Sequence, residues 1–255
     1  MTAILPYVLE RSVTIGASRD TVFRFFTDSA RWAVWWGAGS TIDPRPGGRV
    51  FIRYANGIEA SGEVVEISPP DRIVFTFGYA SGRPMPAGAS RVTIRLADHE
   101  EGTRLILTHE LPDEAARDQH VQGWRYQLSL FANVVADEAF AHAAHAIDAW
   151  FDAWAVEDEA MREGALIVIA DRDVRYCDRF SSIAGLSELI PHVGAAQRFM
   201  PGLKFQRKSD VRHCQGVVLT DWVAVAADGS QRAAGTGVFA FNAAGLIQTA
   251  TVFWS

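Results

Sequence analysis

The central part of the chain, residues 125–163, contains neither glycine nor proline, the two residues that most often interrupt a helix. This helical region separates two halves of a chain of 255 residues. Chains of this length usually form more than one domain, because single hydrophobic cores seldom grow larger. Asp137 and Glu138 provide the signal for a new helix start, an N-cap followed by an acid in the first turn. We expect one domain over residues 1–137 and a second over residues 138–255.

The first half has the pattern of an antiparallel sheet packed against one helix. Apolar and polar residues alternate at strand spacing over residues 7–15, 73–79, 92–96 and 105–109. After Pro112 and Asp113 the period changes, and apolar residues recur every three or four positions up to residue 135. A long helix covering the apolar face of the sheet is the economical arrangement. The sequence therefore predicts an α+β domain that ends on a long helix.

The second half reverses this order. Helical patterns continue to about residue 170, and a further helix is predicted over residues 183–192. Strand patterns occupy residues 174–177, 205–213, 217–226, 233–242 and 246–254. Helices followed by a curved antiparallel sheet predict a second α+β domain.

Several motifs in the first half are typical of a known superfamily. They are Arg31-Trp32 with Trp35-Trp36, the turn at residues 46–49, the segment 62–70, the strand at residues 74–77, and Gly123-Trp124 with Leu128. Residues 7–136 thereby resemble the START-like (SRPBCC) superfamily, in the bacterial branch related to the Hsp90 ATPase activator. This resemblance implies a helix-grip fold with a cavity between the sheet and the long helix.

The second half resembles another superfamily. The matching stretches are residues 170–173 leading to Asp178, the Asp228-Gly229 turn, and the ending at residues 241–255. Residues 139–255 thereby resemble NTF2-like proteins, within them the SnoaL-like and ketosteroid-isomerase branches. The resemblance implies a cone-shaped α+β fold around a cavity, and a homodimer.

The isomerase resemblance implies a set of catalytic candidates. Asp178 matches the proton-shuttling aspartate, and Trp150 matches a hydrogen-bond donor on the first helix. The position of the second donor falls on Gly237, which has no side chain. His213 is a candidate helper that would partner Asp178. Asp178 as a strand-end or turn acid, and His213 as a rim or core histidine, stay open as alternatives.

Aromatic and polar-tipped side chains are the candidate ligand contacts, because such residues line pockets for flat apolar molecules. In the second half these are Tyr176, Trp222 and Trp254. In the first half they are Trp35, Phe75, Phe77, Tyr79, His109 and Trp124. A plain core role stays open for each of them.

Composition and missing motifs narrow the choice of function. The formal net charge of −6 argues against nucleic acid or an anionic membrane as a partner. The sequence has no phosphate-binding loop and no dinucleotide fingerprint, and His142 with His145 lacks further ligands. We therefore expect no cofactor and no metal. Without an N-terminal signal or an apolar run of ~20 residues, a cytoplasmic location is expected.

Three functions are compatible with these features. The first is the binding of small hydrophobic molecules in the domain cavities, as a sensor or carrier. The second is a proton-transfer enzyme, a cyclase, isomerase or dehydratase, that acts on a polyketide-, terpene- or steroid-like substrate through Asp178. The third is a co-chaperone-like interaction with other proteins, which the relatives of the first half suggest.

Overall fold

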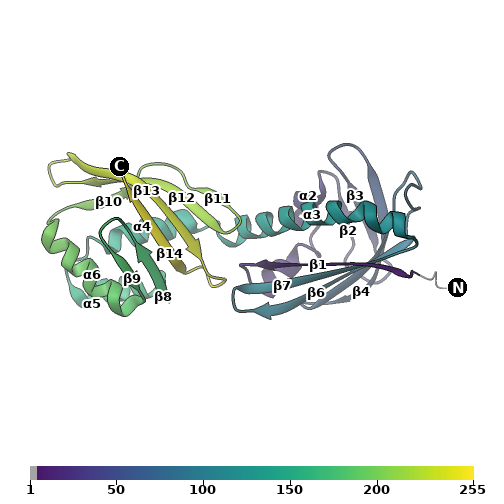
Figure 1. The fold of residues 1–255 in the computed structure, drawn as a ribbon, viewed down its shortest axis with the longest axis horizontal. Coiled ribbons are helices and arrows are strands. Elements are labelled where there is room, and N and C mark those ends of the chain that lie inside the picture. The colour runs from purple at the N-terminus through teal and green to yellow at the C-terminus, as the bar shows by residue number, and fades with distance from the viewer. Residues whose placement is uncertain (1–4) are drawn as a thin grey trace. The chain divides into compact units, whose positions relative to one another are not determined.

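The computed structural model describes residues 5–255 and separates into two compact units, one ending at Ala136 and one spanning Asp137–Ser255 (Figure 1). Each unit combines one seven-stranded sheet with helices. The predicted α+β class is therefore confirmed for both units.

The first unit is built on an antiparallel sheet with the strand order β1-β7-β6-β5-β4-β3-β2. Residues 7–15 form a strand as predicted, and the Asn56-Gly57 turn joins two strands of the sheet with Gly57 at φ 82°. The elements are β1 (Tyr7–Ile15), α1 (Arg19–Arg24), α2 (Ser29–Trp36), β2 (Thr41–Ile42), β3 (Arg49–Arg53), β4 (Glu59–Ser68), β5 (Arg72–Phe77), β6 (Ser90–His99), β7 (Gly102–Leu111) and α3 (Glu114–Ala139).

The long helix α3 covers one face of this sheet, and its start is encoded locally (Figure 1). The Asp113 carboxylate accepts a hydrogen bond from the Ala116 amide at 2.8 Å and so caps the first turn. Trp124, Leu128 and Phe131 of α3 are buried, which matches the predicted spacing. The helix passes through Asp137 without a break, so the predicted restart at Asp137 and Glu138 is wrong.

A cluster of interlocking aromatic rings fills the core beneath α2 and α3. Phe131 stacks on Phe26 with ring centroids 5.0 Å apart, and Trp35 meets Phe131 edge-on at 4.8 Å. Trp32 lies edge-on to Trp35 at 5.1 Å. Edge-to-face and offset contacts of this kind add to the free energy of burial.

A chain of buried hydrogen bonds links α3 to the sheet. The Trp124 indole N–H donates to Nδ1 of His109 at 2.9 Å, and Nε2 of His109 lies 2.8 Å from the Ser90 hydroxyl. That hydroxyl donates to the Phe77 carbonyl at 2.8 Å. The chain is complete only when His109 is neutral with its proton on Nε2. Burial, together with the nearby His120, lowers the pKa of His109 to about 3.

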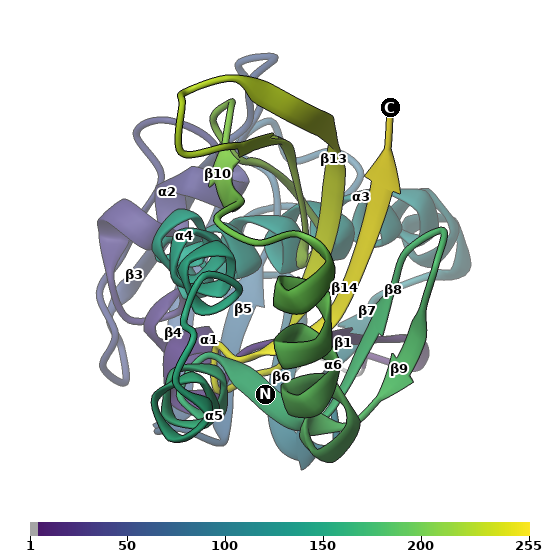
Figure 2. The ribbon, with the colours of Figure 1, turned by 90° about the vertical axis from the view of Figure 1, so that its left-hand side faces the viewer.

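The second unit has the strand order β10-β12-β13-β14-β8-β9, with β11 paired to β12 and β8 parallel to β14. Helices α4 and α6 pack against the sheet, α4 against β10 and α6 against β8 and β9 (Figure 2). Its elements are α4 (Ala143–Ala153), α5 (Glu159–Ile167), β8 (Ala170–Cys177), β9 (Ser182–Ala184), α6 (Leu186–Phe199), β10 (Lys204–Arg207), β11 (Arg212–Cys214), β12 (Val217–Val225), β13 (Gln231–Phe241) and β14 (Ile247–Trp254).

Two segments of the second unit differ from the sequence prediction. The helix predicted over residues 183–192 begins later and runs through Pro191 to Phe199. The strand predicted over residues 205–213 is two short strands, β10 and β11, because the Ser209 hydroxyl accepts a hydrogen bond from the Asp221 amide at 3.0 Å in place of a ladder bond.

The aromatic cluster yields a first prediction. Phe131 is fully buried among rings, whereas Tyr126 on the same helix is 68% exposed. Phe131→Ala should lower the free energy of unfolding of the first unit by about 3–5 kcal/mol, because it leaves a cavity. Tyr126→Ala, the matched control, should change it by less than about 1 kcal/mol. Urea titration followed by tryptophan fluorescence measures both, and equal losses would contradict the packing described.

The neutral His109 yields a second prediction. Since its pKa is lower in the folded than in the unfolded state, the unfolded chain binds more protons between about pH 3 and 6.5. The stability of the first unit should therefore fall by about 1 kcal/mol for each pH unit below 6.5. His109→Gln, which does not titrate, should reduce this slope in urea titrations at pH 4.5 to 7.5. His145→Gln, at an exposed position of α4, should leave it unchanged, and a slope shared by all three proteins would refute the assignment.

Candidate functional site

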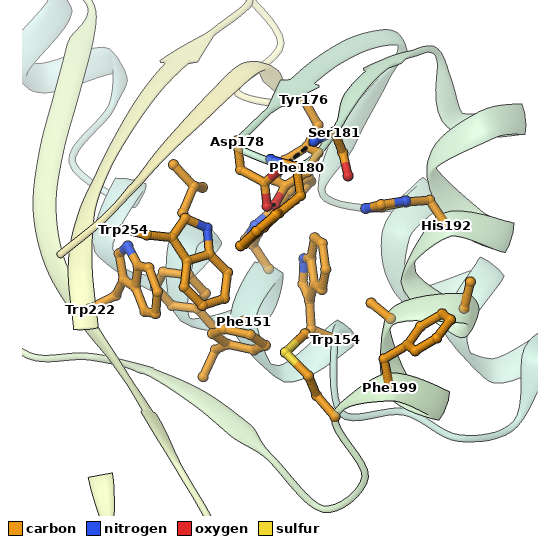
Figure 3. A pocket seen from close by; sticks show the side chains of 16 residues that line it. Phe151, Trp154, Tyr176, Asp178, Phe180, Ser181, His192, Phe199, Trp222 and Trp254 are labelled. Atoms are coloured by element: carbon orange, nitrogen blue, oxygen red, sulfur yellow. Dashed lines mark hydrogen bonds between the residues drawn. The ribbon is translucent and has the colours of Figure 1, made fainter. Parts of the chain in front are cut away.

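A cavity of about 430 Å³ lies within the second unit (Figure 3). Its walls come from α4, β8 and the turn after it, α6, β10, β12 and β14. The lining is mostly aromatic, with polar groups from few residues. The side chains that line it are those of Trp150, Phe151, Trp154, Tyr176, Asp178, Phe180, Ser181, His192, Ala195, Ala196, Phe199, Met200, Phe205, Trp222, Val252 and Trp254.

The aromatic residues predicted as contacts in this half all line the cavity. Trp222 and Trp254, from strands far apart in sequence, meet edge-on with ring centroids 5.0 Å apart. Trp150 of α4 lies 6.1 Å from the ring of Tyr176 on β8. Strand parity, by which alternate residues of a strand share one face of the sheet, predicted that Trp222 faces the cavity, and its side chain is among those that line it.

Asp178 stands at the exit of β8 and accepts three hydrogen bonds. Its Oδ1 accepts from the amides of Phe180 and Ser181 at 2.8 and 2.7 Å, which forms the turn into β9. Its Oδ2 accepts from the Tyr176 hydroxyl at 2.8 Å. Asp178 is therefore a turn acid, one of the two alternatives, and it also lines the cavity; its catalytic role stays a prediction.

Tyr176 supplies the hydroxyl that faces this carboxylate. Burial, and after it the negative charge of Asp178, raises the pKa of the phenol well above its usual range. The hydroxyl therefore stays protonated at neutral pH and donates a hydrogen bond to Asp178. Tyr176 is the penultimate residue of β8 and Asp178 directly follows the strand, two positions later, so that the two side chains meet.

His192 of α6 is a polar residue of the cavity that the sequence did not single out. Its ring lies 5.8 Å from that of Tyr176 and 5.9 Å from that of Trp154, on the wall opposite Trp254 (Figure 3). Within residues 5–255 its ring nitrogens have no hydrogen-bond partner. A signal was present in the sequence, since His192, Ala196 and Phe199 lie at helical spacing and form one stripe of α6 that lines the cavity.

His213 does not partner Asp178, and this prediction is wrong. Its Nδ1 is hydrogen-bonded to the Asp137 carboxylate, its Nε2 accepts from the Gly216 amide at 3.0 Å, and it does not line the cavity. The prediction assumed one continuous strand, in which alternate residues from Phe205 to His213 face the cavity. The strand is broken between β10 and β11, so this alternation does not extend to His213.

Gly237 on β13 leaves no room for the acidic donor of the isomerase pattern. A Cβ at this position would lie 2.7 Å from the ring of Phe239. The ring of Phe239 is itself buried against Trp150 and Phe151. The lining of the cavity contains no donor acid at this position, and its polar side chains include those of Tyr176, Asp178 and His192.

Two aromatic side chains of the cavity are open to solvent. Phe180, in the turn after β8, is 69% exposed, and Phe199, at the end of α6, is 86% exposed. Both belong to the lining, so the cavity opens to solvent beside them (Figure 3).

A smaller cavity of about 250 Å³ lies beside α3 in the first unit. Of the candidates in this half, Phe77, Tyr79 and Trp124 line it, together with His120 of α3, which accepts or donates at 3.1 Å to the Tyr79 hydroxyl. Trp35, Phe75 and His109 do not line it. Trp35 and Phe75 are packed among other rings, and His109 is taken up by the buried hydrogen-bond chain, so the core alternative holds for these residues.

No potential metal site is present in the described part of the chain, since residues 5–255 contain no group of three or more histidine, cysteine, aspartate or glutamate side chains suitably arranged. In the same residues, no helix combines the length and the apolar character that crossing a bilayer requires.

Comparison with solved structures returns proteins that each match about half of the chain. A protein of the SnoaL-like family from Agrobacterium tumefaciens is 22% identical, covering 44% of this chain and 95% of its own, with a TM-score of 0.42. An AHSA1 protein from Silicibacter pomeroyi is 26% identical, covering 52% and 99%, with a TM-score of 0.43. The Aha1 protein from Colwellia psychrerythraea, solved as a dimer, is 16% identical, covering 51% and 96%, with a TM-score of 0.45.

No curated protein matches the chain. That the chain itself forms a homodimer, or contacts a chaperone, stays a prediction. Residues 16–136 match the family model described as "Activator of Hsp90 ATPase homolog 1-like protein". The START-like resemblance of the first half is therefore confirmed over residues 16–136.

Proposed function

We propose that the second unit binds a small, flat, hydrophobic molecule that carries a polar group, and that the chain acts as a carrier or sensor of it. The observation that carries this proposal is the cavity of about 430 Å³ with aromatic walls and one polar end. Its volume lies within the range of about 300–1,000 Å³ found for small-molecule sites. Apolar walls favour the body of such a ligand, and few polar groups orient it.

The polar end indicates what the ligand presents there. The Asp178 carboxylate has accepting capacity beyond its three hydrogen bonds, since two carboxylate oxygens offer about four lone pairs. A ligand hydroxyl could therefore donate to it, and the unpaired ring of His192 could donate or accept. A hydroxyl or carbonyl at one end of a polycyclic, terpene-like or steroid-like body fits this arrangement.

A matched pair of probes tests the proposal. The full chain should bind 2-naphthol about tenfold more tightly than naphthalene, because only 2-naphthol can donate to Asp178. Quenching of tryptophan fluorescence and calorimetry measure both affinities. Ala195→Phe, which places a ring in the cavity from α6, should weaken both probes by about tenfold or more.

The control is Ala160→Phe, at an exposed position of α5 away from the cavity lining, which should bind both probes as the unmodified chain does. Equal effects of the two substitutions, or no binding of either probe, would refute a ligand cavity in the second unit.

A second candidate function, proton transfer, is favoured by the Asp178–Tyr176 hydrogen bond at the polar end. In this reaction the Asp178 carboxylate takes a proton from the carbon next to a substrate carbonyl. The same carboxyl group then returns the proton to another carbon, so the step balances without a cofactor. Tyr176 holds the carboxylate in position, and His192 or Trp150 would donate a hydrogen bond to the developing enolate oxygen.

Substitution of Asp178 distinguishes this candidate from binding alone. If a β,γ-unsaturated steroid ketone is isomerised, Asp178→Asn should lower the turnover number by about 10²–10⁴-fold, while naphthalene binding persists. Absorbance of the conjugated product measures the rate. His213→Gln, outside the cavity, is the matched control and should keep full activity. Retained turnover in Asp178→Asn would remove Asp178 from the mechanism.

A further inference from the structure

A polar groove of about 470 Å³ lies on the second unit beside the cavity already described. It is bounded by the loop after α4, by α5 and α6, and by the turn before β10. Trp154 and Met200 line both the groove and the aromatic cavity, whereas the remaining residues line the groove alone. They are Ala155, Glu157, Glu159, Arg162, Gly194, Gln197, Arg198, Pro201, Gly202, Leu203 and Lys204.

Arg162 is the unusual residue of this groove. Its side chain is only 5% exposed. Its Nη1 donates to the carbonyls of Val156 and Glu157, each at 3.1 Å, and to the Gln197 amide oxygen at 3.4 Å. These acceptors are all neutral, and no carboxylate of residues 5–255 forms an ion pair with Arg162. Since a guanidinium stays charged in proteins, the structure contains a buried positive charge without a counter-charge.

The unpaired edge of this guanidinium is the one suited to anions. Nε is buried without a hydrogen-bond partner, and Nη2 has no partner within the described residues. Nε and Nη2 form the side of a guanidinium that binds a carboxylate or phosphate through two parallel hydrogen bonds. Nη1, on the other side, is used for the loop carbonyls, so the structural role of Arg162 leaves this edge unused.

Helix α6 packs closely against this guanidinium. Gly194 lies in the interior of the helix, where glycine is unfavourable relative to alanine. A Cβ on Gly194 would lie 2.5 Å from Nη2 and 2.9 Å from Cζ of Arg162. Glycine therefore allows the backbone of α6 to pack closely against the guanidinium, which a residue with a Cβ would not.

The other charged residues of the groove are two acids and two bases. Arg198 and Lys204 are exposed at its rim, and neither forms an ion pair within the described residues. Glu157 and Glu159 also line the groove, but neither carboxylate pairs with Arg162. Together with Arg162, the groove therefore has more positive than negative side chains. Of these charged side chains, the buried one is Arg162.

We propose that this groove is a binding site for the carboxylate or phosphate group of a small molecule. Arg162 binds an anionic oxygen through Nη2, and Arg198 and Lys204 add positive charge at the rim. The proposal does not depend on the ligand of the neighbouring cavity, because the residues that define it face the other side of α6.

Nuclear magnetic resonance of the arginine side chains tests the site on the full chain. The Nε–H resonance of Arg162, identified by its loss in Arg162→Lys, should shift and saturate on addition of sodium phosphate or sodium acetate. Sodium chloride at equal ionic strength should cause no saturable shift. Saturation by acetate alone, by phosphate alone or by both supports the site and identifies the anion that it prefers.

Surface variants keep the test valid even if Arg162→Lys fails to fold. Replacing both rim residues, Arg198→Gln and Lys204→Gln, should raise the apparent dissociation constant about fivefold, the effect of two partly exposed charges. Arg212→Gln, an exposed cation outside the groove, is the matched control and should leave it unchanged.

Three results would overturn the proposal. One is the absence of a saturable shift at Arg162 with either anion. Another is a dissociation constant that the rim variants and Arg212→Gln change equally. The third is a shift of the Arg162 resonance in Glu157→Gln as large as the shift expected on addition of phosphate. Such a shift would show that Glu157 is the counter-charge of Arg162 in solution.

Discussion

In each unit of this protein, helices pack against the apolar face of a sheet. The size of the helix side chains at this contact determines the volume of the cavity that remains. In the first unit the cover is the long helix α3, whose Phe131 interlocks with the rings of Phe26 and Trp35. The rings fill most of the interior and leave a cavity of about 250 Å³ at one side. In the second unit α6 presents alanines to the interior where α3 presents large rings, and a cavity of about 430 Å³ remains.

The buried polar groups of the two units are stabilised in different ways. His109 is neutral and fully hydrogen-bonded, so burial only requires that its pKa fall. Asp178 keeps its hydrogen bonds from two amides and one hydroxyl, which makes it both a turn residue and the polar end of the cavity. Arg162 stays charged and forms no ion pair within the described residues, and for this reason we propose that the groove around it binds an anion.

Helix α6 connects these features. One side of it lines the aromatic cavity with His192, Ala196 and Phe199, and another side holds Gly194 against Arg162. Gln197 adds hydrogen bonds at 2.8 Å to the carbonyls of Trp154 and Val156. The position of Trp154, a wall of the cavity, therefore depends on the same helix that shapes the groove.

The sequence alone determined the α+β class, the two sheets, and the course of α3 as far as its apolar spacing extends. Those features follow from local periodicity, which the chain carries in every strand and helix. The sequence could not show that the helix continues through Asp137. The carboxylate of Asp137 is hydrogen-bonded to His213, which is distant in sequence.

Only the tertiary structure decided which histidine reaches the cavity and which residues stay in the core. The break between β10 and β11 depends on a hydrogen bond from Asp221 to Ser209, and it turns His213 away. His192 enters because α6 packs against β8, and Arg162 meets Gly194 because α5 packs against α6. Such contacts join segments whose separation along the chain carries no periodic signal, so only packing of the whole unit determines them.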